Sequence, residues 1–193
     1  MLLPAFPLPM VLFPGERTRL YIFESRYKSL IRDMLNCDSA FAIPAFIHNS
    51  FQGVGAEVRI NQVLREYSGG ELDVEVECIT VFRNNPTHPH PAGKLYDEVT
   101  IARHHHFGDV IDEQCSLLFE TLNQKLRYRY EIPGTGLTIC QIAQRLNPDQ
   151  ATRLRLLKAW NNDAIAAVLR NVLRVELATM APISGRTREP GLN

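Results

Sequence analysis

Residues 3–14 read Leu-Pro-Ala-Phe-Pro-Leu-Pro-Met-Val-Leu-Phe-Pro, and Gly15 follows. Proline fixes φ and has no backbone N–H, so the four prolines keep this stretch extended but prevent it from acting as an uninterrupted central strand. The apolar residues between them need a core to bury against. Pro14-Gly15 is typical of a turn, because proline presets one turn position and glycine accepts the positive φ of the next. We therefore predict a kinked opening segment that ends in a tight turn.

The residues after the turn predict a strand and then a helix. Thr18, Leu20 and Ile22 alternate with arginine and tyrosine over 17–22, as expected of a short strand. From residue 23 the apolar residues recur at helical spacing, which predicts an amphipathic helix over 23–35. Its apolar stripe consists of Phe23, Tyr27, Leu30, Ile31, Met34 and Leu35.

This part of the chain contains three short motifs: Phe6-Pro7-Leu8, Leu12-Phe13-Pro14-Gly15 and Phe23-Glu24-Ser25-Arg26-Tyr27. Together they resemble the N-terminal, substrate-binding domain of Lon proteases, which also occurs as a stand-alone protein. The resemblance implies recognition of unfolded or tagged polypeptides. Full Lon proteases add an ATPase module and a serine–lysine peptidase module, and we expect this chain to be the stand-alone form that lacks both. The motif residues to which we assign a structural role are Pro7, Pro14, Gly15, Glu24, Arg26 and Tyr27.

Glu24 and Arg26 lie two residues apart where the predicted strand passes into the predicted helix. A carboxylate in the first turn of a helix interacts favourably with the helix dipole, which favours a structural role for Glu24. We expect Arg26 to pin the sheet to the helix.

Further strand patterns follow the first helix. The apolar run 40–47 predicts a buried strand, with Pro44 at an edge or bulge. Alternation over 54–67 and 72–82, separated by a Ser-Gly-Gly turn, predicts a long hairpin with a bulge near Cys78. We expect a proline-rich loop at 84–93 and a last strand at 95–106. These strands should close into a small β-barrel-like (PUA-like) sheet beside the packed helix.

The second part of the chain has helical periodicity. We predict a long helix from Asp109, a short one after a Thr138 capping box, one opening at Asn147, and a last one capped by Asn161 or Asn162. The predicted stripe of the long helix is Val110, Gln114, Leu117, Leu118, Thr121, Leu122 and Leu126. The fold class is therefore α+β, and we expect a β-rich subdomain at 1–106, a helical subdomain at 107–181 and a flexible tail at 182–193.

Composition narrows the possible functions. The chain has 193 residues, of which 45% are hydrophobic and 22% charged, as in an ordinary soluble globular protein. Its 21 basic and 21 acidic side chains give no net charge, which argues against a general polyanion binder. We find no signal-peptide pattern and no apolar run of about 18 residues, so we expect a cytoplasmic protein without a membrane span. The four cysteines form no Cys-x-x-Cys pair, and we expect reduced thiols.

Catalytic motifs are not recognisable in the sequence. It contains no P-loop and no Gly-x-Ser-x-Gly elbow, so we expect neither an enzyme nor a cofactor. One alternative is a metal-dependent enzyme that uses His104 and His106, because two such residues on a strand share a face and could bind Zn²⁺ with a loop histidine. The neighbouring histidines are His88, His90 and His105.

The favoured prediction is a non-catalytic module that recognises proteins or peptides. Its tool would be uncovered apolar surface on the β half, which could hold exposed apolar segments or present a sheet edge for strand addition. The candidate binding residues are Met10, Phe13, Tyr21, Phe46 and Phe51. We expect unfolded or tagged polypeptides as partners, together with a protease or chaperone, and the oligomeric state stays open.

A further alternative is an RNA-binding, PUA-like domain, since small barrels of this build occur in RNA-binding proteins. Basic side chains would contact phosphates and tyrosines would stack on bases. These residues are Lys125, Arg127, Arg129, Arg153, Arg155, Lys158, Tyr128 and Tyr130.

Overall fold

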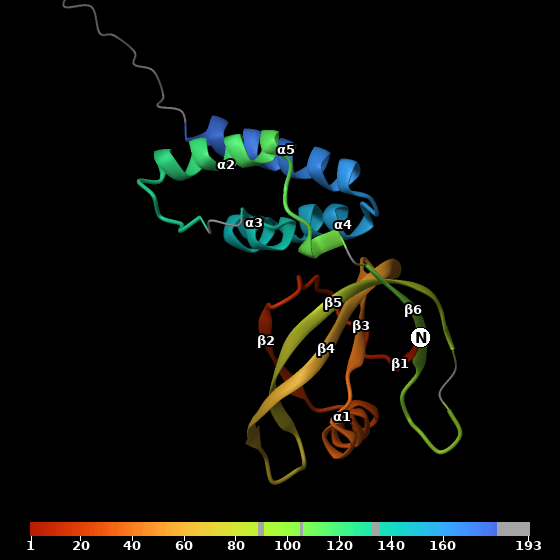
Figure 1. Ribbon diagram of the computed structural model, residues 1–193. Helices are drawn as coiled ribbons and strands as arrows, with labels where there is room; N and C mark the ends of the chain where they lie inside the picture. The colour runs from red at the N-terminus through yellow and green to blue at the C-terminus, as the bar shows by residue number, and fades with distance from the viewer. Residues whose placement is uncertain (89–90, 105, 133–135, 181–193) are drawn as a thin grey trace, which may run out of the picture.

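A computed structural model of the chain describes residues 1–88, 91–104, 106–132 and 136–180. The strands are β1 (Leu2–Pro4), β2 (Arg17–Ile22), β3 (Phe41–Ile47), β4 (Ser50–Glu66), β5 (Leu72–His88) and β6 (Glu98–His104). The helices are α1 (Ser25–Cys37), the short η1 (His106–Gly108), α2 (Glu113–Lys125), α3 (Ile139–Leu146), α4 (Gln150–Lys158) and α5 (Asn162–Thr179). Helices α2 to α5 gather at one end of the sheet, and α1 lies at the other (Figure 1). None of the helices in the described part of the chain is long and apolar enough to cross a membrane.

The six strands form one curled, antiparallel half-barrel. Their order is β1-β6-β5-β4-β3, and β2 pairs with the first part of β5. The opening segment spans the gap between the outer strands, because β1 pairs with β6 while Ala5 and Leu8 bridge to β3. The N–H groups of Phe6 and Leu8 donate to carbonyls of β3 at 2.8 and 3.2 Å. The backbone N–H groups that pair this segment with β3 thus belong to residues between the prolines. The prolines are tolerated because none of these hydrogen bonds needs a proline N–H.

Helix α1 confirms the predicted stripe only in its centre. Tyr27, Leu30, Ile31 and Met34 are buried, whereas Phe23 and Leu35 are 60% and 42% exposed. Residue Glu24 is extended, so the helical period begins at Ser25 and Phe23 falls outside it.

The hairpin of β4 and β5 has the predicted bulge. The pairing register shifts at Cys78, and the extra residue, Ile79, is 43% exposed. The loop predicted at 84–93 was wrong in extent, because β5 continues to His88 and pairs there with β6. Pro44 lies at a register shift in β3, as predicted.

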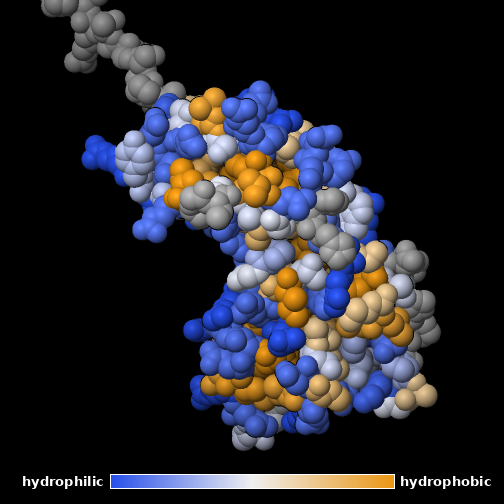
Figure 2. All heavy atoms as spheres, viewed as in Figure 1, coloured by the Kyte–Doolittle hydropathy of each residue, from blue (hydrophilic) through white to orange (hydrophobic). Residues whose placement is uncertain are grey.

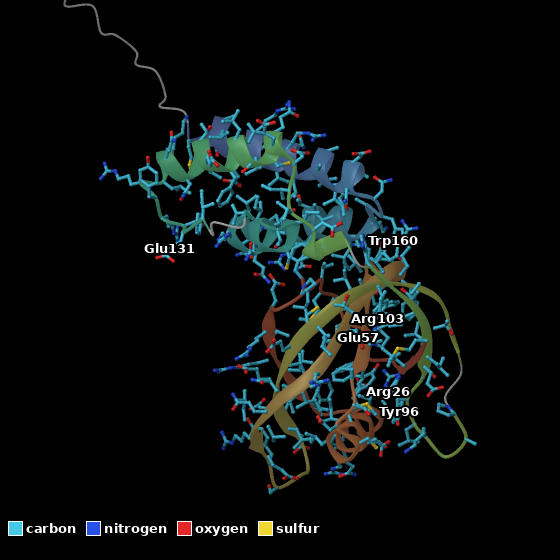
Figure 3. All side chains as sticks on the ribbon, in the orientation of Figure 1. Arg26, Glu57, Tyr96, Arg103, Glu131 and Trp160 are labelled. Carbon is cyan, nitrogen blue, oxygen red and sulfur yellow. The ribbon has the colours of Figure 1, made fainter. Side chains whose placement is uncertain are left out.

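In the alternation over 54–67, Glu57 of β4 is one of the polar residues between the apolar ones, but the structure buries it. Its carboxylate accepts two hydrogen bonds from Arg103 on β6, at 2.7 and 2.6 Å, and the two residues lie together in Figure 3. The opening segment covers this face of the sheet, so alternation along β4 does not separate core from solvent. The small apolar cluster on the covered face consists of Leu3, Ala5, Ala42, Phe82, Val99 and Ile101.

In the helical part, the capping predictions were right for Thr138, which forms a complete capping box, and for Asn161. Asn147 was predicted to open a helix, but it ends α3 in a left-handed conformation, and Asp149 caps α4 instead. The stripe predicted for the long helix was right only in part. Leu122 is buried and Leu118 and Leu126 pack against the core, but Val110 and Leu117 are 61% and 64% exposed.

Helix α2 starts only at Glu113, and the face that it buries is set by its packing against α5. The buried residues of α2 are Cys115, Phe119, Leu122 and Asn123. The predicted tail at 182–193 lies outside the described residues.

The Pro14-Gly15 turn joins the sheet to the helices at a region that we call the junction. Gly15 has the expected positive φ of 83°. The Pro14 carbonyl accepts the Cys140 thiol of α3 at 3.0 Å, and Phe13 stacks on Phe107 of η1 with ring centroids 5.6 Å apart. The molecule is narrower at the junction than in the β half or the helical part (Figure 2). One core cluster nevertheless runs through both parts of the molecule.

Arg153 of α4 is the central polar residue of the junction. It is only 7% exposed, and its guanidinium donates to both carboxylate oxygens of Glu16, at 2.8 and 2.9 Å. It also donates to the carbonyls of Val11 and Pro148, at 3.2 and 3.1 Å. A buried charge is tolerated because each of its donors has a partner.

Candidate functional site

A groove of about 530 Å³ lies beside the N-terminal end of α1, and we call it the aromatic groove. Three parts of the chain meet α1 there: the opening segment, the tip of the β3–β4 hairpin and the residues before β6. Its lining residues are Ala5, Pro7, Arg26, Tyr27, Phe46, Phe51, Leu95, Tyr96 and Asp97. Figure 3 shows Arg26 and Tyr96 on the same side of the β half, near α1.

The hairpin wall of the groove consists of two phenylalanines. Phe46 and Phe51 pack edge to face with ring centroids 4.9 Å apart. They are directly opposite in the β3–β4 register, and a two-residue turn at His48 and Asn49, both with positive φ, fixes that register. Phe51 is 46% exposed, so a large apolar face remains available to a ligand.

The helix wall consists of Tyr27 and Arg26. Tyr27 is buried and stacks on Phe6 with ring centroids 3.9 Å apart, and this burial raises the pKa of its phenol. Arg26 lies over the Tyr27 ring at 4.5 Å and forms an ion pair of 2.9 Å with Glu24. The prediction that Arg26 pins the sheet to the helix is therefore wrong, because its partner is two residues away in sequence.

The third wall is held in place by a small polar network. The Tyr96 hydroxyl and the Lys94 ammonium both donate to the same oxygen of Asp33 on α1, each at 2.8 Å. These hydrogen bonds, that of Lys94 first, hold the pKa of Asp33 below its usual value. Burial and the same carboxylate raise the pKa of Tyr96, which therefore stays a neutral donor. The segment before β6 is thereby fixed against α1.

The chemistry of this groove suits binding. Its lining combines aromatic and aliphatic surface with one guanidinium and one carboxylate, and includes no serine, cysteine or histidine among the described residues. Across the described residues, no group of three or more His, Cys, Asp or Glu side chains is placed to hold a metal ion. Such a lining can bury apolar side chains and orient a peptide through a few polar contacts.

Five of the groove residues were predicted from the sequence, two as binding candidates and three as structural motif residues. The candidates are Phe46 and Phe51, and the motif residues are Pro7, Arg26 and Tyr27. Leu95, Tyr96 and Asp97 were not predicted as site residues. Their segment is held against α1 by the hydrogen bond from Tyr96 to the distant Asp33, and no local pattern signals that contact.

The other three binding candidates lie elsewhere. Phe13 is fully buried at the junction, so it is a core residue and its assignment to a binding surface was wrong. Met10 is half-buried in a different groove, between the opening segment and the turn that joins α3 to α4. Tyr21 is 55% exposed on β2, where it stacks on Phe23 and packs edge to face with Tyr67, at centroid distances of 5.9 and 5.8 Å.

Among the side chains that the structure describes, those of the two alternative functions do not gather into a site. His104 is 2% exposed, its Nε2 lies 3.1 Å from the Ala159 carbonyl oxygen, and its ring packs on Trp160 at 4.0 Å. Its ring therefore serves in packing. His90 and His105, and the side chains of His88 and His106, lie outside what the structure describes.

Of the basic residues assigned to RNA, Arg153 is buried in the junction and has no surface for a phosphate. The others are divided between the end of α2 and α4, at opposite sides of the helical part (Figure 1).

Comparisons with known proteins agree with this fold. A family model described as the ATP-dependent protease La (LON) substrate-binding domain matches residues 2–177. The structure of a Lon N-terminal domain protein from Xanthomonas campestris is similar, with a TM-score of 0.65, 24% identity, and coverage of 94% of this chain and 99% of the other. The N-terminal domain of Lon protease from the Mycobacterium avium complex aligns with a TM-score of 0.55 and 12% identity, over 95% and 100% of the two chains. No curated protein sequence matched.

Proposed function

Because the chain belongs to the family of LON substrate-binding domains, we propose that it is a non-catalytic module that holds exposed apolar segments of other polypeptides in the aromatic groove. The observation that carries this proposal is the Phe46–Phe51 pair, which leaves a partly uncovered aromatic face beside Tyr27 and Tyr96. Each aromatic side chain of a bound segment would be removed from water against these rings.

The geometry of the aromatic groove favours a side chain of a bound polypeptide over a free small molecule. The lining of the groove includes opposite charges, Arg26 and Asp97, that can orient a polar peptide backbone. Aromatic anchors surrounded by polar residues are typical of protein recognition sites. We expect weak, transient binding, with a Kd on the order of micromolar.

The test is the binding of a labelled unfolded casein, followed by fluorescence anisotropy. Phe51→Asp places a charge on the hairpin wall and should weaken binding about tenfold, which corresponds to about 1.4 kcal/mol. The matched control is Leu117→Asp, because Leu117 is also exposed but lies on α2, away from the groove. Circular dichroism must show that both variants fold.

Two results would contradict the proposal. One is equal binding by wild type and Phe51→Asp. The other is the absence of saturable casein binding together with salt-dependent binding of single-stranded RNA, which would favour the nucleic-acid alternative.

A further inference from the structure

Strand β2 leaves one of its two edges unpaired within the described residues. It pairs only with β5, and it lies at the outer margin of the sheet (Figure 1). The Cys78 N–H donates to the Glu16 carbonyl at 2.9 Å, which fixes the phase of the hydrogen bonds between the two strands. Since this phase alternates along an antiparallel pair, the N–H and C=O groups of Arg17, Arg19 and Tyr21 point away from β5.

These outward groups form a template for another strand. No backbone or side-chain hydrogen bond within the described residues uses them. They recur every second residue, about 6.8 Å apart, as the groups of an incoming strand do. The edge therefore offers three donors and three acceptors in the correct spacing.

Of the two arginine side chains along this edge, only one is neutralised by a carboxylate of β5 among the described residues. Arg17 forms an ion pair of 2.8 Å with Glu77. Arg19 lies opposite Glu75, whose carboxylate instead accepts from Asn61 at 2.6 Å. Arg19 thus has no ion-pair partner in the described part of the chain, and a carboxylate on an added strand would supply one.

A group of aromatic side chains lies around Tyr21, two residues after Arg19 on β2. The exposed ring of Tyr21 is flanked by Phe23, which is 60% exposed, and by Tyr67. An aromatic side chain opposite Tyr21 would extend this stack. At the other end of β2, a groove of about 570 Å³ lined by Met10, Leu12 and Thr18, among others, could receive the side chain opposite Thr18.

A second copy of the chain fits this edge poorly. The antiparallel pairing of two β2 strands that overlaps all three outward residues places Arg19 directly opposite Arg19 of the other copy. Like charges in this position are destabilising. The charge pattern therefore favours a segment of a different polypeptide with an acidic residue at this position.

We propose that the free edge of β2 binds an extended polypeptide segment by antiparallel strand addition and prefers the order aromatic–x–acidic. In this register the aromatic residue faces Tyr21 and the acidic residue faces Arg19. The inference rests on the proposed role in polypeptide recognition, but it concerns a different surface from the aromatic groove.

The probe is a capped, labelled peptide, Thr-Thr-Phe-Val-Glu-Val-Thr, whose binding is measured by fluorescence anisotropy. Arg19→Glu should weaken binding five- to tenfold, and replacing the peptide's glutamate by lysine should restore it. The matched control is Arg59→Glu, because Arg59 also faces a glutamate of β5 but lies on β4, on the other side of β5 from β2. The peptide of reversed sequence should bind at least threefold more weakly than the original.

The backbone is tested separately. Methylation of the peptide nitrogen at the glutamate removes a donor to β2 and should weaken binding about tenfold, whereas methylation at the valine before it should have little effect. In hydrogen exchange followed by NMR, the peptide should protect the amides of Arg17, Arg19 and Tyr21.

Three outcomes would overturn the inference: no peptide binding, equal effects of the two methylations, or no added protection of these amides. Protection that rises with protein concentration without peptide would place a second copy on the edge and would also overturn it. Phe51→Asp separates the two proposals, since it should weaken casein binding but leave the peptide bound to β2.

Discussion

The junction between sheet and helices should depend on the ion pair of Arg153 and Glu16. Arg153→Met retains an apolar stem against the Phe13 ring, over which the guanidinium lies at 4.9 Å, but it removes all the donors of Arg153. The side chains of Arg153 and Glu16 are only 9% and 18% exposed, so the carboxylate of Glu16 would remain largely buried without its cation. Removing one partner of a buried pair costs about 3 kcal/mol.

This loss can be measured by urea unfolding. With a slope of about 2 kcal/mol per molar urea, the midpoint should fall by about 1.5 M. Trp160, the single tryptophan of the chain, packs on His104 at the end of the sheet and reports on the junction by fluorescence. Circular dichroism reports on the whole chain. Both probes should give the same midpoint, because one core cluster runs through both parts.

A double variant and a surface variant serve as controls. Adding Glu16→Gln to Arg153→Met removes the unpaired charge and should recover at least about 1 kcal/mol, since the amide oxygen can still accept the Phe13 N–H. The exposed Arg59→Ala should change the free energy of unfolding by less than about 0.5 kcal/mol. A loss below about 1 kcal/mol in Arg153→Met, or no recovery in the double variant, would refute the reasoning.

Three further predictions concern other parts of the molecule. Gly55→Ala should lower the free energy of unfolding by about 3 kcal/mol in urea titrations, because the added methyl group would meet the backbone of β3 and the ring of Phe82. Asp33→Asn should lower the Tm by about 3 °C at pH 7. Since hydrogen bonding depresses the folded pKa of Asp33, its contribution exists above the unfolded pKa, and the difference in Tm should shrink as the pH falls below about 4. In native protein at pH 8, iodoacetamide should label only the exposed Cys37, as mass spectrometry can verify, because burial raises the thiol pKa of Cys78, Cys115 and Cys140, to about 12 for the last two.

The types of many residues in the aromatic groove were predictable from the sequence, but their grouping into one exposed site was not. Phe46 and Phe51 were recognisable as aromatic residues in a hairpin region, and Tyr27 as part of a helix stripe. Phe13 has the same character in the sequence, yet it is buried against the helical part. Sequence cannot separate these cases, because exposure depends on which distant surface covers each ring.

The sequence by itself determined the local features of this protein. The prolines fixed the extended opening segment, Pro14-Gly15 fixed the turn, and Thr138 with Gln141 fixed the start of α3. Each depends on φ preferences or on hydrogen bonds between residues at most three positions apart.

Only the tertiary structure decided which faces are covered. It buried Glu57 with Arg103, set the phase of the buried face of α2, joined Tyr96 to Asp33 and left one edge of β2 without a partner strand in the described part of the chain. These outcomes depend on contacts between segments far apart in the chain. Such contacts form because burying apolar surface is favourable for the molecule as a whole, and a local pattern cannot specify its distant partner.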